Sequence, residues 1–137
     1  MRFILFFLVS VFMLFSCKEQ KSETVQATEN AENTAVLNTD IDIPTAKNKL
    51  AQSSEIVLLD VRTPEEIALG KIGEAMEMDF TSPDFKEKVA ALDKNKEYVV
   101  YCAAGGRSAR AVNIMKELGF EKAYNLKGGY AGWTEVQ

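Results

Sequence analysis

The feature that most constrains the fold of this chain is an alternation of short apolar runs and helical segments that begins at Ile41. The runs are rich in β-branched and aromatic residues and apolar at consecutive positions, which is typical of strands covered on both faces. The expected strands are 56–59, 76–80, 98–101 and 123–126, and the expected helices are 44–51, 64–69, 82–92 and 108–118. Strands separated by helices imply right-handed crossovers. We therefore expect one α/β domain over residues 41–137, with a mostly parallel central sheet and helices on both faces.

Local signals mark where several of these helices begin and end. Thr63, Pro64 and Glu66 form the pattern of a capping box, with Thr63 as the N-cap and proline at the first helical position. Gly70 and Gly119 follow two of the helical segments directly, as expected of helix stops.

The N-terminal segment differs in composition from this domain. Arg2 is followed by an apolar run, Phe3–Phe15, that only Ser10 interrupts. As a helix this run is about 20 Å long, shorter than the roughly 30 Å hydrocarbon core of a bilayer. A basic residue before a short apolar run is typical of a secretory signal peptide, so we expect residues 1–16 to be removed. The alternative is a buried helix, which no polar face or cap supports.

The apolar run ends in Leu14-Phe15-Ser16-Cys17, which resembles the bacterial lipobox, in which a small residue precedes a cysteine that becomes lipidated. We expect lipid chains on Cys17 to anchor the protein at the bacterial cell envelope, on the periplasmic face or the outer membrane. The alternative is that Cys17 is the last residue of an ordinary signal peptide. Residues 18–40 contain no aromatic residue and are mostly polar, so we expect residues 17–40 to form a lipidated N-terminus and a flexible tether.

Composition excludes several classes of function. The formal net charge of −4 argues against nucleic acid as a partner. The chain has no histidine, which removes every Ser-His and Cys-His catalytic pair and the commonest zinc ligand. Its two cysteines are too few for a disulfide framework or a four-cysteine metal site. We therefore expect no metal and no cofactor.

The chemistry of the chain is concentrated in the loop that follows the strand 98–101. Its residues are Cys102, Ala103, Ala104, Gly105, Gly106, Arg107 and Ser108, and a helix follows. In an open parallel sheet, ligands bind outside the carboxyl ends of the strands, which is where Cys102 lies. Small residues let backbone N–H groups turn inward, and the helix N-terminus and Arg107 add positive potential. These features favour a thiolate at Cys102, whereas the alternative is an inert buried cysteine.

Three motifs in order resemble the single-domain rhodaneses, a family of sulfurtransferases. The first is Leu59-Asp60-Val61-Arg62-Thr63-Pro64-Glu65-Glu66 with the following Gly70–Ala75, the second is the Cys102–Ser108 loop, and the third is Leu126–Trp133. The resemblance covers residues 41–137. Lys71 stands where the family usually has histidine, and Gly73-Glu74 stands where it has Pro-Gly.

The resemblance implies a rhodanese-like fold and a reaction in which Cys102 accepts a sulfane sulfur as a persulfide. The expected donor is a small sulfur compound such as thiosulfate, and the expected acceptor is a thiol or a cyanide-like molecule. We expect the protein to be a monomer. The backbone N–H groups of the loop stabilise the terminal sulfur. Asp60 supports the loop by pairing with Arg107, and Arg62 either steers anions or pairs with Glu65 or Glu66. The glycines at 128 and 129 and Trp133 are expected to serve packing.

Two other functions remain open on the sequence. One is a non-catalytic rhodanese-like binding module, although inactive members of the family typically lack the loop cysteine. The other is a phosphatase of the same fold, but those enzymes have one more residue between cysteine and arginine than the four found here. A thioredoxin-like redox role is excluded because the chain has no C-x-x-C motif.

Overall fold

The computed structural model describes residues 39–136. The expected signal peptide, the lipidation site Cys17 and most of the expected tether lie outside the described residues. No helix within residues 39–136 is long and apolar enough to cross a membrane.

The described residues form one five-stranded sheet with the strand order β1-β5-β4-β2-β3, and every neighbouring pair is parallel. The strands are β1 Asp40–Ile41, β2 Val57–Asp60, β3 Met76–Glu77, β4 Tyr98–Tyr101 and β5 Ala123–Leu126. The prediction of a mostly parallel sheet is thus confirmed, and β4 and β5 have the predicted bounds. The first strand begins at Asp40, within the expected tether, because its backbone pairs with Asn125 and Leu126 of β5.

The third strand is shorter than predicted. It ends at Glu77 rather than Phe80, although the amides of Met78 and Phe80 still donate to the carbonyls of Asp60 and Val61. This segment lies at the edge of the sheet, where a strand has only one neighbour and regular pairing ends early.

Five helices connect and follow the strands: α1 Ile43–Gln52, α2 Pro64–Ile67, α3 Phe85–Ala90, α4 Gly106–Glu117 and α5 Gly129–Glu135. The capping box at Thr63 is present, and the carboxylate of Glu66 accepts a hydrogen bond from the Thr63 amide at 3.0 Å. The predicted start of the third helix at Ser82 is wrong, because Ser82 and Asp84 form a turn before α3 begins. The helix α5 was not predicted.

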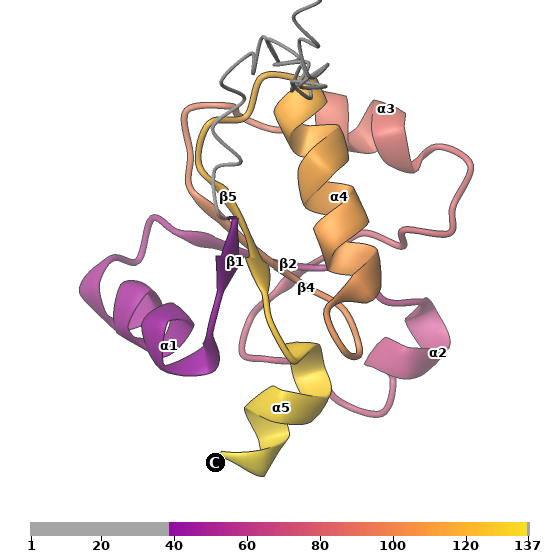
Figure 1. Ribbon diagram of the computed structural model, residues 1–137. Coiled ribbons are helices and arrows are strands. Elements are labelled where there is room, and N and C mark those ends of the chain that lie inside the picture. The colour runs from indigo at the N-terminus through magenta and orange to yellow at the C-terminus, as the bar shows by residue number, and fades with distance from the viewer. Residues whose placement is uncertain (1–38, 137) are drawn as a thin grey trace, which may run out of the picture. The chain divides into compact units, whose positions relative to one another are not determined.

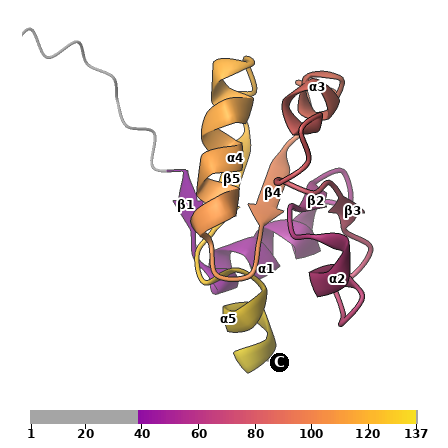
Figure 2. The ribbon, with the colours of Figure 1, turned by 90° about the vertical axis from the view of Figure 1, so that its right-hand side faces the viewer.

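The helices cover the two faces of the sheet in different groups (Figures 1 and 2). On one face α3 and α4 pack on the strands through Val89, Val112 and Met115, which join one apolar cluster. On the other face a second cluster contains Ala46 of α1 and Leu126, with Trp133 of α5 packed against it. The sheet is therefore the middle of three layers, as the sequence predicted.

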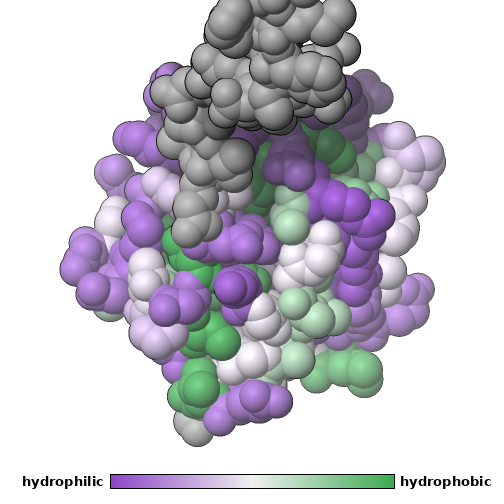
Figure 3. All heavy atoms as spheres, viewed as in Figure 1, coloured by the Kyte–Doolittle hydropathy of each residue, from purple (hydrophilic) through white to green (hydrophobic). Residues whose placement is uncertain are grey.

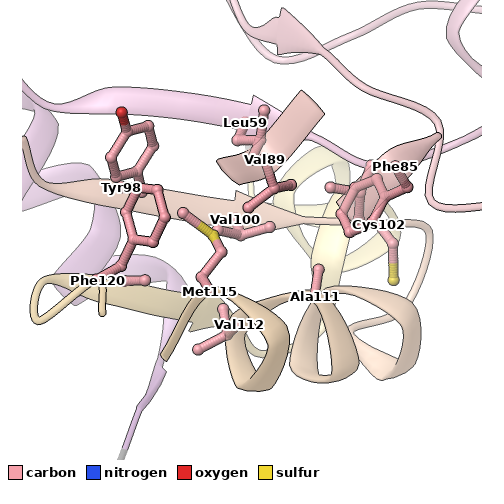
Figure 4. Packing of buried hydrophobic residues seen from close by; sticks show 12 residues of the cluster. Leu59, Phe85, Val89, Tyr98, Val100, Cys102, Ala111, Val112, Met115 and Phe120 are labelled. Carbon is pink, nitrogen blue, oxygen red and sulfur yellow. The ribbon is translucent and has the colours of Figure 1, made fainter. Parts of the chain in front are cut away.

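The strand β4 serves both clusters by alternating its side chains. Tyr98, Val100 and Cys102 belong to the cluster beneath α4, whereas Val99 and Tyr101 belong to the other. Figure 4 shows Cys102 at one end of the first cluster, beside Phe85, with Tyr98 at the other end. The period of two along an extended backbone thus directs the Cys102 side chain to the side of the sheet where α4 begins.

The exterior of the described residues is largely polar on the face seen in Figure 3, where apolar residues reach the surface in small areas. The large apolar side chains that are most exposed are Leu69, Met76 and Val136.

Candidate active site

Cys102 lies at the carboxyl end of β4, immediately before the loop that leads into α4. It is a free cysteine, and 2% of its surface is exposed. A central strand of a parallel sheet presents its carboxyl end to the crevice where such sheets bind ligands. The structure thus places Cys102 at the end of the strand where the sequence predicted it.

The loop after Cys102 turns back on the sulfur. The amide of Gly105 donates a hydrogen bond to Cys102 Sγ at 3.1 Å. Gly105 has φ +104°, a left-handed conformation that side chains disfavour, and it serves as the N-cap of α4. The sulfur consequently lies near the positive end of the α4 dipole.

The backbone at the start of α5 is hydrogen-bonded to this loop. The amides of Tyr130 and Ala131 donate to the carbonyls of Cys102 and Ala103 at 2.8 and 3.0 Å. Gly129 has φ +56°, and a Cβ there would lie 2.8 Å from the carbonyl oxygen of Ala103. The backbone amides at the start of α5 thus bind carbonyl groups of the loop, and this close approach requires glycine at position 129.

The environment of Cys102 lowers the pKa of its thiol below the ordinary value. Burial is the largest influence and raises the pKa, but the hydrogen bonds to the sulfur outweigh it. They come from the side chain and amide of Ser108 and from the amides of Ala104 and Gly105. Three backbone N–H groups and one hydroxyl therefore stabilise the thiolate, in agreement with the cradle inferred from the small residues.

Ser108 connects the sulfur to the buried Asn125 and, through it, to the exposed Asp40, a connection that the sequence did not reveal. Its hydroxyl lies 3.4 Å from Cys102 Sγ and 2.6 Å from Asn125 Oδ1. Asn125 Nδ2 donates to Asp40 Oδ1 at 2.8 Å. Asn125 is a polar residue at a buried position of a strand, and that contrast is the signal by which sequence reasoning could have found it.

Arg107 forms a bidentate ion pair with Glu66 of α2. Its Nη1 and Nη2 atoms donate to the two carboxylate oxygens at 2.7 and 2.6 Å. This pair lowers the pKa of Glu66 to about 2. It raises the pKa of Arg107, and the charge of Cys102 contributes to that increase. Arg107 thus faces both the nucleophile and a carboxylate.

The predicted partner of Arg107, Asp60, is wrong, and so is the predicted pairing of Arg62 with the carboxylates of Glu65 or Glu66. Asp60 is completely buried and pairs with Arg62 at 2.6 Å. Arg62 also donates to the backbone carbonyls of Glu66 and Gly70, and it stacks 4.0 Å from the centroid of the Tyr130 ring. Arg62 is 3% exposed, so it does not meet anions in solution.

The error has a geometric cause. Asp60 and Arg62 are two residues apart at the end of β2, so their side chains leave the strand on the same side. The turn of α2 then places Glu66, rather than Asp60, opposite the loop arginine. Asp60 and Arg62 therefore stabilise the segments around the site and do not contact the sulfur.

The departures from the family pattern form contacts of their own. Lys71 pairs with Glu77 of β3 at 2.7 Å. The amide of the next residue, Ile72, donates to the hydroxyl of Tyr101.

Within residues 39–136 no three Cys, Asp or Glu side chains come together as a set that could hold a metal ion.

Comparison with protein families gives a match to the rhodanese-like domain over residues 43–136. Among curated proteins, the chain is 38% identical over 94 residues to YtwF of Bacillus subtilis, a protein provisionally named a sulfurtransferase, covering 69% of this chain and 88% of that protein. It is 31% identical over 95 residues to a sulfurtransferase of Allochromatium vinosum, covering 69% and 87%. It is also 34% identical over 94 residues to the tRNA uridine(34) hydroxylase of Bartonella quintana, covering 65% of this chain but 31% of that protein.

Solved structures of rhodanese-like proteins are also similar to this chain. A rhodanese-like domain protein from Staphylococcus aureus superposes with a TM-score of 0.62 at 34% identity, covering 69% of this chain and 90% of that one. A rhodanese-related protein from Thermoplasma volcanium gives 0.63 at 30% identity, covering 71% and 91%. Proteins named for different activities share this domain, so the reaction has to be argued from the residues of the site.

Proposed function

The chain belongs to the rhodanese-like domain family, and on that premise we propose that it is a sulfurtransferase that carries a sulfane sulfur as a persulfide on Cys102. Relatives named as sulfurtransferases, which this chain matches over most of their length, support the proposal.

The reaction has two steps. The Cys102 thiolate attacks the outer sulfur of a donor such as thiosulfate, a new S–S bond forms, and sulfite leaves with the electron pair of the broken S–S bond. A nucleophilic acceptor, such as a thiolate or cyanide, then attacks the outer sulfur of the persulfide and releases the Cys102 thiolate. No net oxidation occurs, so the cycle needs no redox cofactor.

The observation that carries the proposal is the set of donors around one sulfur atom. The Gly105 amide lies 3.1 Å from Cys102 Sγ, and the hydroxyl of Ser108 lies 3.4 Å from it. The loop amides, whose positions are fixed by the backbone, stabilise a sulfur anion without reorganising during the reaction. The histidine base that many cysteine enzymes use is dispensable here, because the loop itself favours the thiolate.

The test is transfer of sulfur from thiosulfate to cyanide, followed as thiocyanate. The wild-type protein should form thiocyanate, and Cys102→Ser should reduce the rate to background. Serine retains the shape of cysteine but cannot carry a persulfide. Thiocyanate formation that survives Cys102→Ser would contradict the proposed nucleophile.

The two alternative functions predict different results in the same assays. A binding module gains no sulfur from thiosulfate or from a thiol persulfide. A phosphatase hydrolyses a phosphate ester in a reaction that depends on Cys102. We expect no such hydrolysis, because the four residues between Cys102 and Arg107 leave little room for a phosphoryl group.

We further propose that the domain acts at the bacterial cell envelope, anchored through lipid chains on Cys17 and held by residues 17–40 as a tether. The support is the sequence alone: Arg2, the apolar run and the lipobox-like Leu14-Phe15-Ser16-Cys17. Labelled palmitate should enter the wild-type protein in a bacterial host, and Cys17→Ser should prevent this. Incorporation that persists in the variant would refute the lipid anchor.

A further inference from the structure

A chain of hydrogen bonds runs from the buried Cys102 to Asp40, which is exposed on the edge strand of the sheet. It passes from Cys102 after β4 to Ser108 of α4, then to Asn125 of β5 and Asp40 of β1. Ser108 is completely buried and Asn125 is 3% exposed. Water therefore does not compete for Ser108 and Asn125, although Asp40 at the end of the chain is exposed. The hydrogen atoms of the two buried groups have to be accounted for.

The acceptor at the end of the chain fixes the direction of every bond. Asp40 Oδ1 accepts the hydrogen bond at 2.8 Å, so the group that faces it is the NH₂ group of Asn125. The carbonyl oxygen of Asn125 then faces Ser108 at 2.6 Å, and it too can only accept. The Ser108 hydroxyl must therefore donate its hydrogen to Asn125.

This direction has a consequence for the sulfur. A hydroxyl has one hydrogen, so Ser108 cannot donate to Asn125 and to Cys102 at the same time. While Cys102 is a thiol, its S–H group can donate to the Ser108 oxygen at 3.4 Å. When Cys102 is an anion, the Ser108 hydroxyl gains a stronger acceptor in the sulfur.

We propose that Asn125 is a positioning residue that acts through Ser108. It holds the Ser108 hydrogen while Cys102 is a thiol, and the hydrogen turns to the sulfur when Cys102 becomes a thiolate. The inference rests on the proposed function only in extending the same role to the persulfide anion. Each ionisation thus breaks the hydrogen bond between Ser108 and Asn125 and forms one between Ser108 and the sulfur.

The other groups that face Cys102 stay in place during this exchange. They are Arg107 of α4, with its partner Glu66 of α2, and the amides of the loop. Because Asn125 competes with the sulfur for one hydrogen, removing its oxygen should favour the thiolate. If Asn125 only supported the fold of the loop, its removal would instead disfavour the thiolate.

The experiment measures the rate of alkylation by iodoacetamide against pH, in a Cys17→Ser background that leaves Cys102 as the only thiol. Asn125→Leu, which has a similar shape but no acceptor, should lower the midpoint by about half to one pH unit, the equivalent of one net hydrogen bond. Ser108→Ala should raise it, because the thiolate loses a donor. In the double variant, the midpoint should equal that of Ser108→Ala.

A second variant guards against misfolding of Asn125→Leu. Asp40→Asn keeps the shape of the side chain but offers an NH₂ group, so the Asn125 amide can turn over and donate to Ser108. The Ser108 hydrogen is then free for the sulfur, and the midpoint should again fall. Asp42→Asn removes the same charge two residues away and retains the N-cap of α1, so its midpoint should stay within a few tenths of the wild-type value.

Two results would overturn the inference. One is a midpoint in Asn125→Leu or Asp40→Asn that is unchanged or raised. The other is a shift that persists when Ser108 is alanine, since Asn125 would then act by another route. Alkylation does not require sulfur transfer, so failure of this inference and failure of the proposed function are separate outcomes.

Discussion

At the scale of single residues, the site combines the thiol of Cys102, the guanidinium of Arg107 and the carboxylate of Glu66. Arg107 faces Cys102, but both of its outer nitrogen atoms are engaged by Glu66. The favourable charge of the arginine is therefore partly balanced before any substrate arrives. The ion pair is partly exposed, with 22% of the Arg107 side chain and 34% of the Glu66 side chain accessible, so solvent weakens it and an anion can compete for Arg107.

The first prediction concerns the contribution of Arg107 to the thiolate. The hydrogen bonds to Cys102 lower its pKa, and the charge of Arg107 adds to this preference. Arg107→Ala should raise the pH midpoint of Cys102 alkylation, so that less thiolate is present at neutral pH. Because Glu66 balances Arg107, we expect a rise of less than about one unit. An unchanged or lowered midpoint would show that the loop amides act alone.

The second prediction concerns the competition between Glu66 and an anionic donor. Glu66→Gln keeps an acceptor for the Thr63 amide but weakens the pair with Arg107, so the KM for thiosulfate should fall by up to about fivefold, the equivalent of about 1 kcal/mol. The matched control is Glu65→Gln, which removes the same charge one residue away from the pair. If both variants change KM equally, general electrostatics rather than the pair is responsible.

At the scale of elements, the position of Cys102 depends on α5, a helix that lies much later in the sequence. The amides of Tyr130 and Ala131 at the start of α5 hold the carbonyls of Cys102 and Ala103. Gly129 permits this contact because no Cβ lies between the two backbones. The closing motif of the chain thus serves the loop through packing, as the sequence suggested, although α5 itself was not predicted.

This dependence gives the third prediction. Gly129→Ala should lower the free energy of unfolding by about 2 kcal/mol or more and slow the alkylation of Cys102, because its Cβ meets the Ala103 backbone in addition to the cost of a positive φ. Gly119→Ala is the control, since Gly119 also has a positive φ but no atom lies within 4 Å of its Cβ position. Equal losses in urea unfolding would mean that the contact with the loop is unimportant.

The elements that sequence reasoning found and missed differ in a physical way. Tyr98–Tyr101 is a continuous apolar run, fully buried between two layers, so composition alone identifies β4. The strand β1 has two residues, one of them Asp40, and exists because β5 offers it a partner. The helix α5 begins with glycine and contains another, so its local propensity is poor and its contacts with the loop and the second cluster stabilise it.

The side-chain pairings were the least predictable part of the site. The loop residues Cys102–Ser108 could be identified from their spacing, because they are contiguous. The partners of Arg107 and Arg62 depend on how α2 packs beside the loop, and that is a property of the tertiary structure. Asn125 was missed for the same reason, since only the sheet brings it next to Ser108.

At the scale of the whole domain, one buried ion pair joins several parts of the fold. Arg62 pairs with Asp60 of β2, donates to the carbonyl of Gly70 after α2, and stacks on Tyr130 of α5. Its pKa is raised because the interactions with Asp60 outweigh burial, which acts in the opposite direction. Arg62 therefore stays charged, and loss of the pair affects segments far apart in the sequence.

The fourth prediction follows from this arrangement. Arg62→Leu leaves the Asp60 carboxylate buried without its cation, which typically costs about 3–5 kcal/mol. We expect a lower Tm and a lower urea midpoint. The amides of the Cys102 loop should also exchange hydrogen faster, because Tyr130 loses its partner. Replacing both residues, with Asp60→Leu added, should recover part of the stability. If Arg62→Leu alone matches the wild-type Tm, the pair does not hold these segments together.

The central claim is that Cys102 accepts one sulfur atom, and intact-mass measurement after a single turnover tests it most directly. The protein is incubated with thiosulfate and separated from excess donor, and its intact mass is measured before any acceptor is added. We predict that the wild-type chain gains the mass of one sulfur atom, that cyanide removes it, and that Cys102→Ser gains none. A wild-type chain that takes up no sulfur from thiosulfate or from a thiol persulfide would contradict the account and favour a binding module.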